Sequence, residues 1–146
     1  MAVLTRNAVA TDREACIELL QELRAADRGP LSAEAGEVFD QLLDGERGQV
    51  LVAEDDGELL GLASVTFNLA MRYGREYCQL EELVVDPAAR GKKVGALLVE
   101  ATIDCARARG CAEIGAYLVA ATEHNRPFYE KFGFEAVGTE MRQVLG

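Results

Sequence analysis

The sequence lacks several patterns that define large classes of protein. None of its apolar runs approaches the roughly 20 residues that a membrane-spanning helix needs. Its N-terminus, MAVLTRNAV, lacks the basic region and the long apolar stretch of a secretion signal. No repeat, linker or low-complexity segment divides the 146 residues, a length that suits one substantial core. We therefore expect a cytoplasmic protein with a single domain over residues 1–146.

Metal-binding patterns are missing as well. The four cysteines (Cys16, Cys78, Cys105 and Cys111) follow no CxxC or other metal-ligand spacing, and His124 is the only histidine. Reduced, partly buried thiols are the expected state of these cysteines. His124 falls in a predicted loop, where a solvated side chain is a better interpretation than a general base. We expect no bound metal.

Positive charge is scarce outside one short stretch. Lysine and arginine number 15 against 25 acidic residues, and the formal net charge is −10. Such a protein repels nucleic acid and anionic membrane surfaces, so neither is an expected partner. The stretch RGKK at 90–93 is a local basic cluster on this acidic background. It indicates either an anionic ligand or a solvated helix start, and spacing alone leaves both open.

The spacing of apolar residues predicts a mixed α/β sheet. A helical stripe covers 94–109 and ends at Gly110, and the T-D-R-E capping box at 11–14 starts an earlier helix. The stretch 49–67 predicts two strands around a D-D-G-E turn, which is an antiparallel hairpin. Further strands are predicted at 2–9, 76–85, 113–119 and 134–144, and further helices from Ser32 and from Asn125. The predicted order is β-α-α-β-β-β-α-β-α-β.

The loop PAARGKKVGALL at 87–98 follows an apolar strand and opens a helix. The first N–H groups of a helix are unpaired and, with the helix dipole, they form an anion site. Glycine lets the backbone approach phosphates without a Cβ in the way. The loop is neither a Walker loop nor a Rossmann fingerprint, because both of those glycine patterns are absent. A pyrophosphate is a physically reasonable occupant.

The segment LVVDPAARGKKVGALLVEA resembles motif A of the GCN5-related N-acetyltransferases, the GNAT superfamily. Arg90, Gly91 and Gly95 match the family pattern, and Lys93 replaces its central glycine. About 40 residues later, RPFYEKFGFEAVG resembles the family's motif B. The resemblance covers about 80–138 strongly and, by element order, the whole chain. It implies a GNAT fold, with a mostly antiparallel central sheet flanked by helices.

The resemblance also implies a site for acetyl-coenzyme A. The strands at 80–85 and 113–119 would splay apart and admit the pantetheine arm. Lys92, Lys93 or Arg126 would meet the 3′-phosphate, and Lys93 would supply its N–H if its φ were negative. Asn125 either caps the short helix or contacts the coenzyme. The implied backbone contacts are the amides from Arg90 to Ala96 (Arg90, Gly91, Lys92, Lys93, Val94, Gly95 and Ala96) on the pyrophosphate, and Leu83, Val84 and Val85 on the pantetheine.

Three groups are candidates for the acetyl-transfer chemistry. Tyr129 stands at the motif B tyrosine, where a phenol protonates a thiolate leaving group, and a purely packing role with Phe128 and Phe132 is the alternative. The N–H near Val84 is the expected oxyanion donor. Glu81 and Glu82 lie mid-strand between apolar residues, and burial there would raise a carboxylate pKa and suit it to act as a base.

The acidic pair leaves two questions open. Adjacent strand residues face opposite sides, so only one of the two is expected to face the acceptor. Glu81 is the preferred candidate, with Glu82 close behind, either directly or through water. The alternative is a structural pair that bonds backbone or basic neighbours.

These observations lead to a functional hypothesis with one alternative. The chain is expected to be an N-acetyltransferase that moves the acetyl group of acetyl-CoA to a primary amine of a small molecule or peptide. Attack is expected to be direct, in a ternary complex. The alternative is a GNAT-fold module that binds coenzyme A for regulation or partner binding without turnover. Family members often dimerise through the C-terminal strand, so the resemblance also implies a homodimer.

Overall fold

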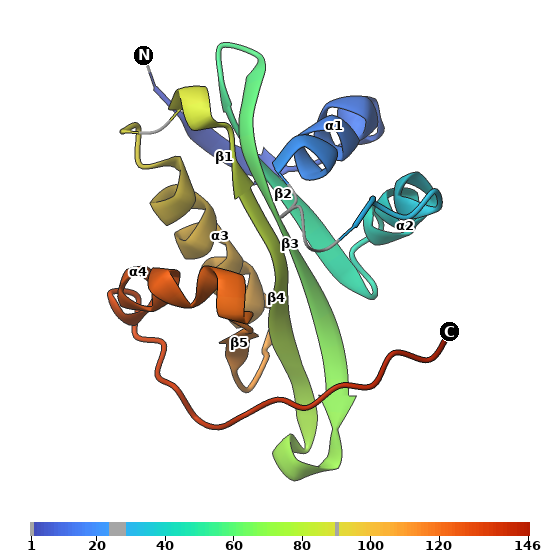
Figure 1. Ribbon diagram of the computed structural model, residues 1–146, viewed down its shortest axis with the longest axis vertical. Helices are drawn as coiled ribbons and strands as arrows, with labels where there is room; N and C mark the ends of the chain where they lie inside the picture. Colours follow the sequence, from blue (N-terminus) through green and yellow to red (C-terminus); the bar gives the residue numbers. More distant parts are fainter. Residues whose placement is uncertain (1, 24–28, 90) are drawn as a thin grey trace.

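The computed structural model describes residues 2–23, 29–89 and 91–146 and is built on one five-stranded sheet (Figure 1). Strands follow one another in chain order across the sheet. The first four pair antiparallel and the last pairs parallel, which confirms a mixed, mostly antiparallel sheet. The strands are β1 (Leu4–Asn7), β2 (Gly48–Asp55), β3 (Glu58–Ala70), β4 (Arg75–Val85) and β5 (Ile114–Ala116).

Helices cover both faces of this sheet. One side carries α1 (Arg13–Leu23) and α2 (Ala35–Leu42), and the other carries α3 (Val94–Arg109) and α4 (Arg126–Glu130) (Figure 1). Val50 and Val52 of β2 pack with α1 and α2, whereas Leu51 and Ala53 pack with α3. A strand buried on both faces is apolar at every position, which explains the continuous VLVA of β2.

The β2–β3 hairpin confirms the turn predicted at D-D-G-E. Asp56 and Gly57 both have positive φ (55° and 85°), as a two-residue type I′ turn requires. Farther along β3, a Cβ on Gly61 would lie 2.8 Å from the Val84 carbonyl oxygen and 3.2 Å from side-chain atoms of α3. Glycine therefore lets α3 and β4 approach this hairpin closely.

The first helix begins differently from the prediction. A short 3-10 turn at Ala10–Asp12 precedes α1, and the Val9 N–H donates to the Asp12 carboxylate at 2.8 Å. Arg6 donates to the same carboxylate at 2.8 and 3.1 Å and to Glu54 on β2 at 3.2 Å. Asp12, and not Thr11 with Glu14, therefore fixes the helix start, because β1 brings the Arg6 guanidinium beside it.

The sheet ends earlier than the sequence predicts. Strand β5 covers 114–116 instead of 113–119, and among the described residues 134–144 form no strand. That segment crosses the open side of the molecule without pairing to β5 (Figure 1). Val137 and Met141 within it are 96% and 91% exposed. A strand forms only when its backbone groups pair with another strand, and this segment does not pair with the free edge of β5.

Within the described parts of the chain, no helix has both the length and the apolar character needed to span a bilayer.

Candidate active site

The centre of the site is the point where β4 and β5 separate. Their parallel pairing runs from Cys78–Ile114 to Leu80–Ala116 and stops there, while β4 continues to Val85. A cavity of about 540 Å³ opens at this fork. The predicted splay of the two strands is therefore present. The cavity lining includes Glu81, Glu82, Leu83 and Val84 from β4, Tyr117 to Val119 after β5, and Asn125 and Tyr129.

A β-bulge in β4 sets the direction of the acidic pair. The register places Val65 opposite Leu80 and Ser64 opposite Glu82, so Glu81 is the extra residue. The Thr66 hydroxyl donates to Glu81 at 2.7 Å, and the Ser64 hydroxyl donates to Glu82. Ser64 and Thr66 are two apart on β3 and share one face. Both carboxylates therefore reach the same face, and the expectation that only one could do so is wrong.

The burial expected for this pair is also absent. Glu81 and Glu82 are both exposed, although the hydroxyl that bonds Glu82 belongs to the buried Ser64. A carboxylate has about four lone-pair positions, so one hydroxyl donor leaves room for a water or an amine. Neighbouring serine and threonine hydroxyls, and not desolvation, therefore orient the two candidate bases.

Tyr129 lies on α4 with its ring packed and its edge on the cavity. Its ring centroid is 5.1 Å from that of Phe128 and 5.7 Å from that of Phe134, both edge to face. Burial raises the pKa of the Tyr129 phenol above its usual value of 10.0. The hydroxyl therefore stays protonated at neutral pH, as a proton donor must. Tyr129 therefore packs against its aromatic neighbours and also lines the cavity, so the two predicted roles are compatible.

The basic loop departs from expectation at Lys93. This residue caps α3 with φ 59° and ψ 29°, in the left-handed region, whereas the prediction required a negative φ. The family's central glycine occupies this position, and glycine adopts a left-handed φ without strain. Gly91 also has a positive φ, of 91°. Arg90, the first residue of the predicted cradle, lies outside the described residues.

The side chains of the other predicted coenzyme contacts differ in whether they already have a partner in the protein. Asn125 precedes α4 but its side chain makes no cap hydrogen bond, so the capping interpretation is wrong, and it lines the cavity instead. Arg126 pairs with Glu123, and Lys92 pairs with Asp55. His124 is exposed, as predicted.

Sequence reasoning missed Arg142. This residue belongs to the unpaired C-terminal segment, yet it lines the same cavity as the acidic pair. Its guanidinium lies 5.1 Å from the centre of the Tyr117 ring and 2.6 Å from Glu140. Nothing in the local sequence marks it, because its place depends on where the segment crosses the molecule.

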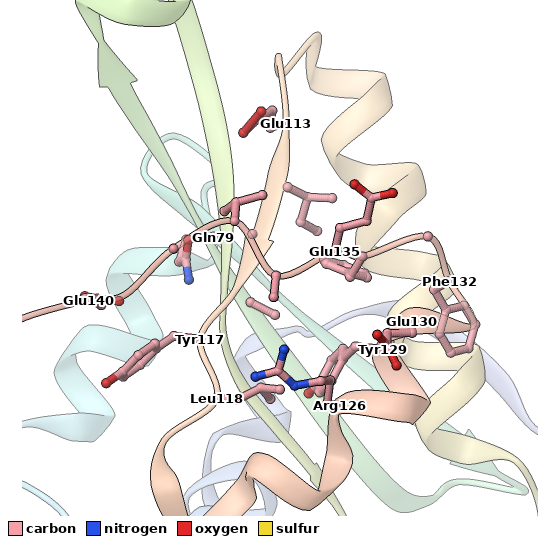
Figure 2. A pocket seen from close by; sticks show the side chains of 18 of the residues that line it. Gln79, Glu113, Tyr117, Leu118, Arg126, Tyr129, Glu130, Phe132, Glu135 and Glu140 are labelled. Carbon is pink, nitrogen blue, oxygen red and sulfur yellow. The ribbon is translucent and has the colours of Figure 1, made fainter.

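A second cavity, of about 950 Å³, lies along the free edge of β5. Figure 2 shows Arg126 and Tyr129 on its α4 side and Glu135 and Glu140 on the segment that crosses it. Tyr129 lines both cavities, so the two are adjacent. This is the space beside β5 where a sixth strand would pair.

The cysteines take no part in the site. All four are free, and burial raises the pKa of the Cys16 and Cys78 thiols to about 12. The predicted free, partly buried thiols are confirmed. Within the described residues, no cluster of three or more histidine, cysteine or acidic side chains is placed to hold a metal ion.

The model of the acetyltransferase (GNAT) family matches residues 15–134. The chain belongs to this family. Among its curated relatives is a glucosamine 6-phosphate N-acetyltransferase of Trypanosoma brucei brucei, 33% identical over 98 residues. That match covers 66% of this chain and 65% of the relative, just under two thirds of its length. A probable glucosamine 6-phosphate N-acetyltransferase 2 of Oryza sativa subsp. japonica is 30% identical over 146 residues, 96% of this chain and 86% of the relative.

Solved structures share the fold across the whole chain. A transcriptional regulator from Bacillus halodurans has a TM-score of 0.85 at 24% identity and covers 99% of this chain and 100% of its own. The glucosamine-6-phosphate N-acetyltransferase from Arabidopsis thaliana has a TM-score of 0.80 at 24% identity, with 100% of each chain covered. At this identity the likeness shows the fold alone. The predicted family and GNAT fold are confirmed.

The family uses acetyl-CoA as its acetyl donor. Together with the N-acetyltransferase names of the relatives, membership supports an acetyl-CoA-dependent N-acetyltransferase.

Proposed function

We propose that this protein transfers the acetyl group of acetyl-CoA to a primary amine by direct attack in a ternary complex. The observation that carries the proposal is the cavity at the β4–β5 fork, which Glu81, Glu82 and Tyr129 line together. Candidate bases for the amine and a candidate acid for the leaving thiolate therefore line the same cavity.

In the proposed complex the coenzyme lies along the free edge of β4. Beyond Leu80 this edge has no pairing with β5, so Leu83, Val84 and Val85 can bond the pantetheine as an added strand. The described amides from Gly91 to Ala96 hold the pyrophosphate at the start of α3, apart from that of Lys92, which donates to the Ala89 carbonyl oxygen at 3.2 Å.

The chemistry divides between the two sides of the cavity. Glu81 or Glu82, directly or through water, takes the proton of the ammonium, and the free amine attacks the thioester carbon. A β4 main-chain N–H near Val84 stabilises the oxyanion as the C–N bond forms. Leu83 and Val85 are the residues that present their N–H groups to the open edge, because the Val84 carbonyl and the Asp86 N–H both face β3. The C–S bond then breaks, and Tyr129 gives its proton to the departing thiolate. The nitrogen, positively charged after attack, loses its second proton, which returns to the Tyr129 oxygen directly or through water and leaves a neutral amide. The raised pKa of Tyr129 keeps that proton available throughout the neutral range.

For the acceptor we propose an amine that also carries a phosphate. The relatives from Trypanosoma and Oryza are named for glucosamine 6-phosphate. Two carboxylates and the Arg142 guanidinium line one cavity, an arrangement that fits a molecule with a cation and an anion. An amino sugar phosphate meets both requirements.

A homodimer is the proposed assembly, formed through the C-terminal segment. The free edge of β5 can accept an extended strand, and the segment is strand-like in sequence but unpaired. Light scattering should give the mass of two chains, and a chain ending at Gly138 should give the mass of one. Equal masses for both would exclude this assembly. The exposed apolar side chains that a partner would cover are Val137, Met141, Val144 and Leu145.

The test of the reaction is coenzyme release with acetyl-CoA and a panel of amines. The panel contains glucosamine 6-phosphate, glucosamine, a polyamine, an aminoglycoside and a lysine peptide. We expect turnover to be fastest with the amino sugar phosphate, and Arg142→Gln to raise its KM without changing that of glucosamine. Tight acetyl-CoA binding without release on any amine would favour the non-catalytic module. A cytoplasmic location and the absence of nucleic-acid partners stay predictions.

A further inference from the structure

The basic loop before α3 contains two lysines with different surroundings. The Lys92 ammonium lies 3.8 Å from Oδ2 of Asp55, the last residue of β2. The Lys92 side chain is 41% exposed, whereas that of Asp55 is only 9% exposed. Lys93 is exposed and forms no ion pair with any described residue. The charge of Lys92 is therefore already compensated by Asp55, whereas the charge of Lys93 is not compensated by any described residue.

The Asp55 carboxylate is unusual because it is buried. It is one of few buried charged residues in the described chain, and it ends a strand whose other residues are largely apolar. Burying a carboxylate is unfavourable unless a cation or hydrogen bonds compensate it. Lys92 is the cation that the structure places beside it. The pair links the loop after β4 to the β2–β3 hairpin, which also accepts the Asp86 N–H at the Leu60 carbonyl oxygen, at 2.8 Å.

A buried negative charge beside the loop matters for an anionic ligand. The coenzyme proposed above brings several phosphate charges to the amides of this loop. An uncompensated carboxylate within a Debye length, about 10 Å at 0.1 M salt, would repel them. Lys92 removes that repulsion by pairing with Asp55, and it fastens the loop at the same time.

We propose that Lys92 is a positioning residue that acts on coenzyme binding through Asp55, while Lys93 is the lysine that contacts the phosphates. This inference rests on the proposed acetyl-CoA site. It makes Asp55, a residue outside both sequence motifs, part of the machinery that prepares the loop.

A double-mutant cycle separates the two roles. Acetyl-CoA affinity is measured by calorimetry for the wild type, Lys92→Met, Asp55→Asn and the double variant. We expect Lys92→Met to lose about tenfold in affinity, as for loss of one charge interaction. The double variant should return to within about threefold of the wild type, because the repelling carboxylate is gone.

Lys93→Met is the matched control. It should lose about tenfold as well, and adding Asp55→Asn should not restore it. If Lys92 contacts the phosphates directly, the Lys92→Met/Asp55→Asn variant will stay as weak as Lys92→Met, and the inference is overturned.

Urea unfolding of the same four proteins without ligand is the second readout. A coupling between Asp55 and Lys92 should appear as a smaller midpoint loss in the double variant than the two single losses together. If the wild type fails to bind acetyl-CoA, the proposed function fails, and this cycle still decides whether the pair fastens the loop. Additive losses would remove the pair from that role.

Discussion

The two halves of the sheet differ in how completely they are paired. Strands β1, β2 and β3 form antiparallel ladders, with a register shift between Ala53 and Glu54, and the Arg6–Asp12–Glu54 cluster fastens their outer end. Strand β4 bonds β3 along its length but β5 over only three residue pairs. Beyond β5 the chain continues to its end with no further strand among the described residues.

The difference shows where ligands and partners can enter. In the paired half, the backbone groups bond each other and the side chains fill two cores. In the open half, part of β4 and the edge of β5 leave backbone groups free for an added strand. The bulge at Glu81 lies at the boundary of the two halves, and the cavity of about 540 Å³ adjoins it on the open side.

The largest expected effect is in the open half. Tyr129→Phe should lower turnover by about 10²–10⁴-fold, because the phenol supplies the proton for the thiolate. Acetyl-CoA affinity should change little, since the packed ring remains. Tyr117→Phe, which lines the same cavity, is the control and should keep most of its activity. The assay measures release of the coenzyme thiol. A nearly normal rate for Tyr129→Phe would show that the residue only packs and is not the proton donor.

The bulge itself is tested by replacing its two carboxylates separately. Because both reach the face of Ser64 and Thr66, one should act as the base and the other should support it. We expect Glu81→Gln to lower turnover by about 10²-fold and Glu82→Gln by less. If both variants keep nearly normal turnover, neither carboxylate is the base.

A smaller effect is expected in the paired half. Asp12→Asn should lower the free energy of unfolding by about 1–3 kcal/mol, because it weakens the Arg6 contact in a largely buried place. Arg6 and the Val9 N–H lower the pKa of Asp12 below its usual 3.8. Its stabilisation is therefore complete above pH 3.8 and is lost as the pH falls through the lower, folded value.

Urea unfolding at several pH values checks this expectation. The gap between the wild type and Asp12→Asn should be constant near neutrality and close in acid. Acetyl-CoA affinity should stay unchanged at neutral pH, since the cluster lies in the paired half. A gap that persists at low pH would show that the charge of Asp12 is not what stabilises this end of the sheet.

The smallest effect is expected at Lys93, in the basic loop before α3. Lys93→Gly should raise the free energy of unfolding by roughly 0.5–1 kcal/mol. The left-handed φ costs a lysine about 1–2 kcal/mol, and the greater freedom of glycine in the unfolded chain offsets part of that gain. Asp56→Gly, at φ 55°, is the comparison and should gain less, because aspartate adopts the left-handed region more readily than lysine does. Loss of stability at Lys93 alone would show that its side chain makes a compensating contact.

The paired half could be predicted well from sequence. The D-D-G-E turn and the helix at 94–109 have local causes, and both appear where predicted. The bulge could not be predicted, because it is a property of the register between two strands and not of β4 alone. The strand expected at 134–144 depends on pairing with another strand, and in the structure the segment does not pair with the free edge of β5. Arg142 enters the cavity only through the path of that segment.

The most direct test of the proposed site is the set of backbone amide NMR shifts on adding acetyl-CoA. We expect the largest changes at Leu83, Val84 and Val85 and at the amides from Gly91 to Ala96. Strands β1 and β2 away from the loop should change little. Shifts confined to the paired half, or no saturable shifts at all, would contradict the placement of acetyl-CoA in the β4–β5 fork.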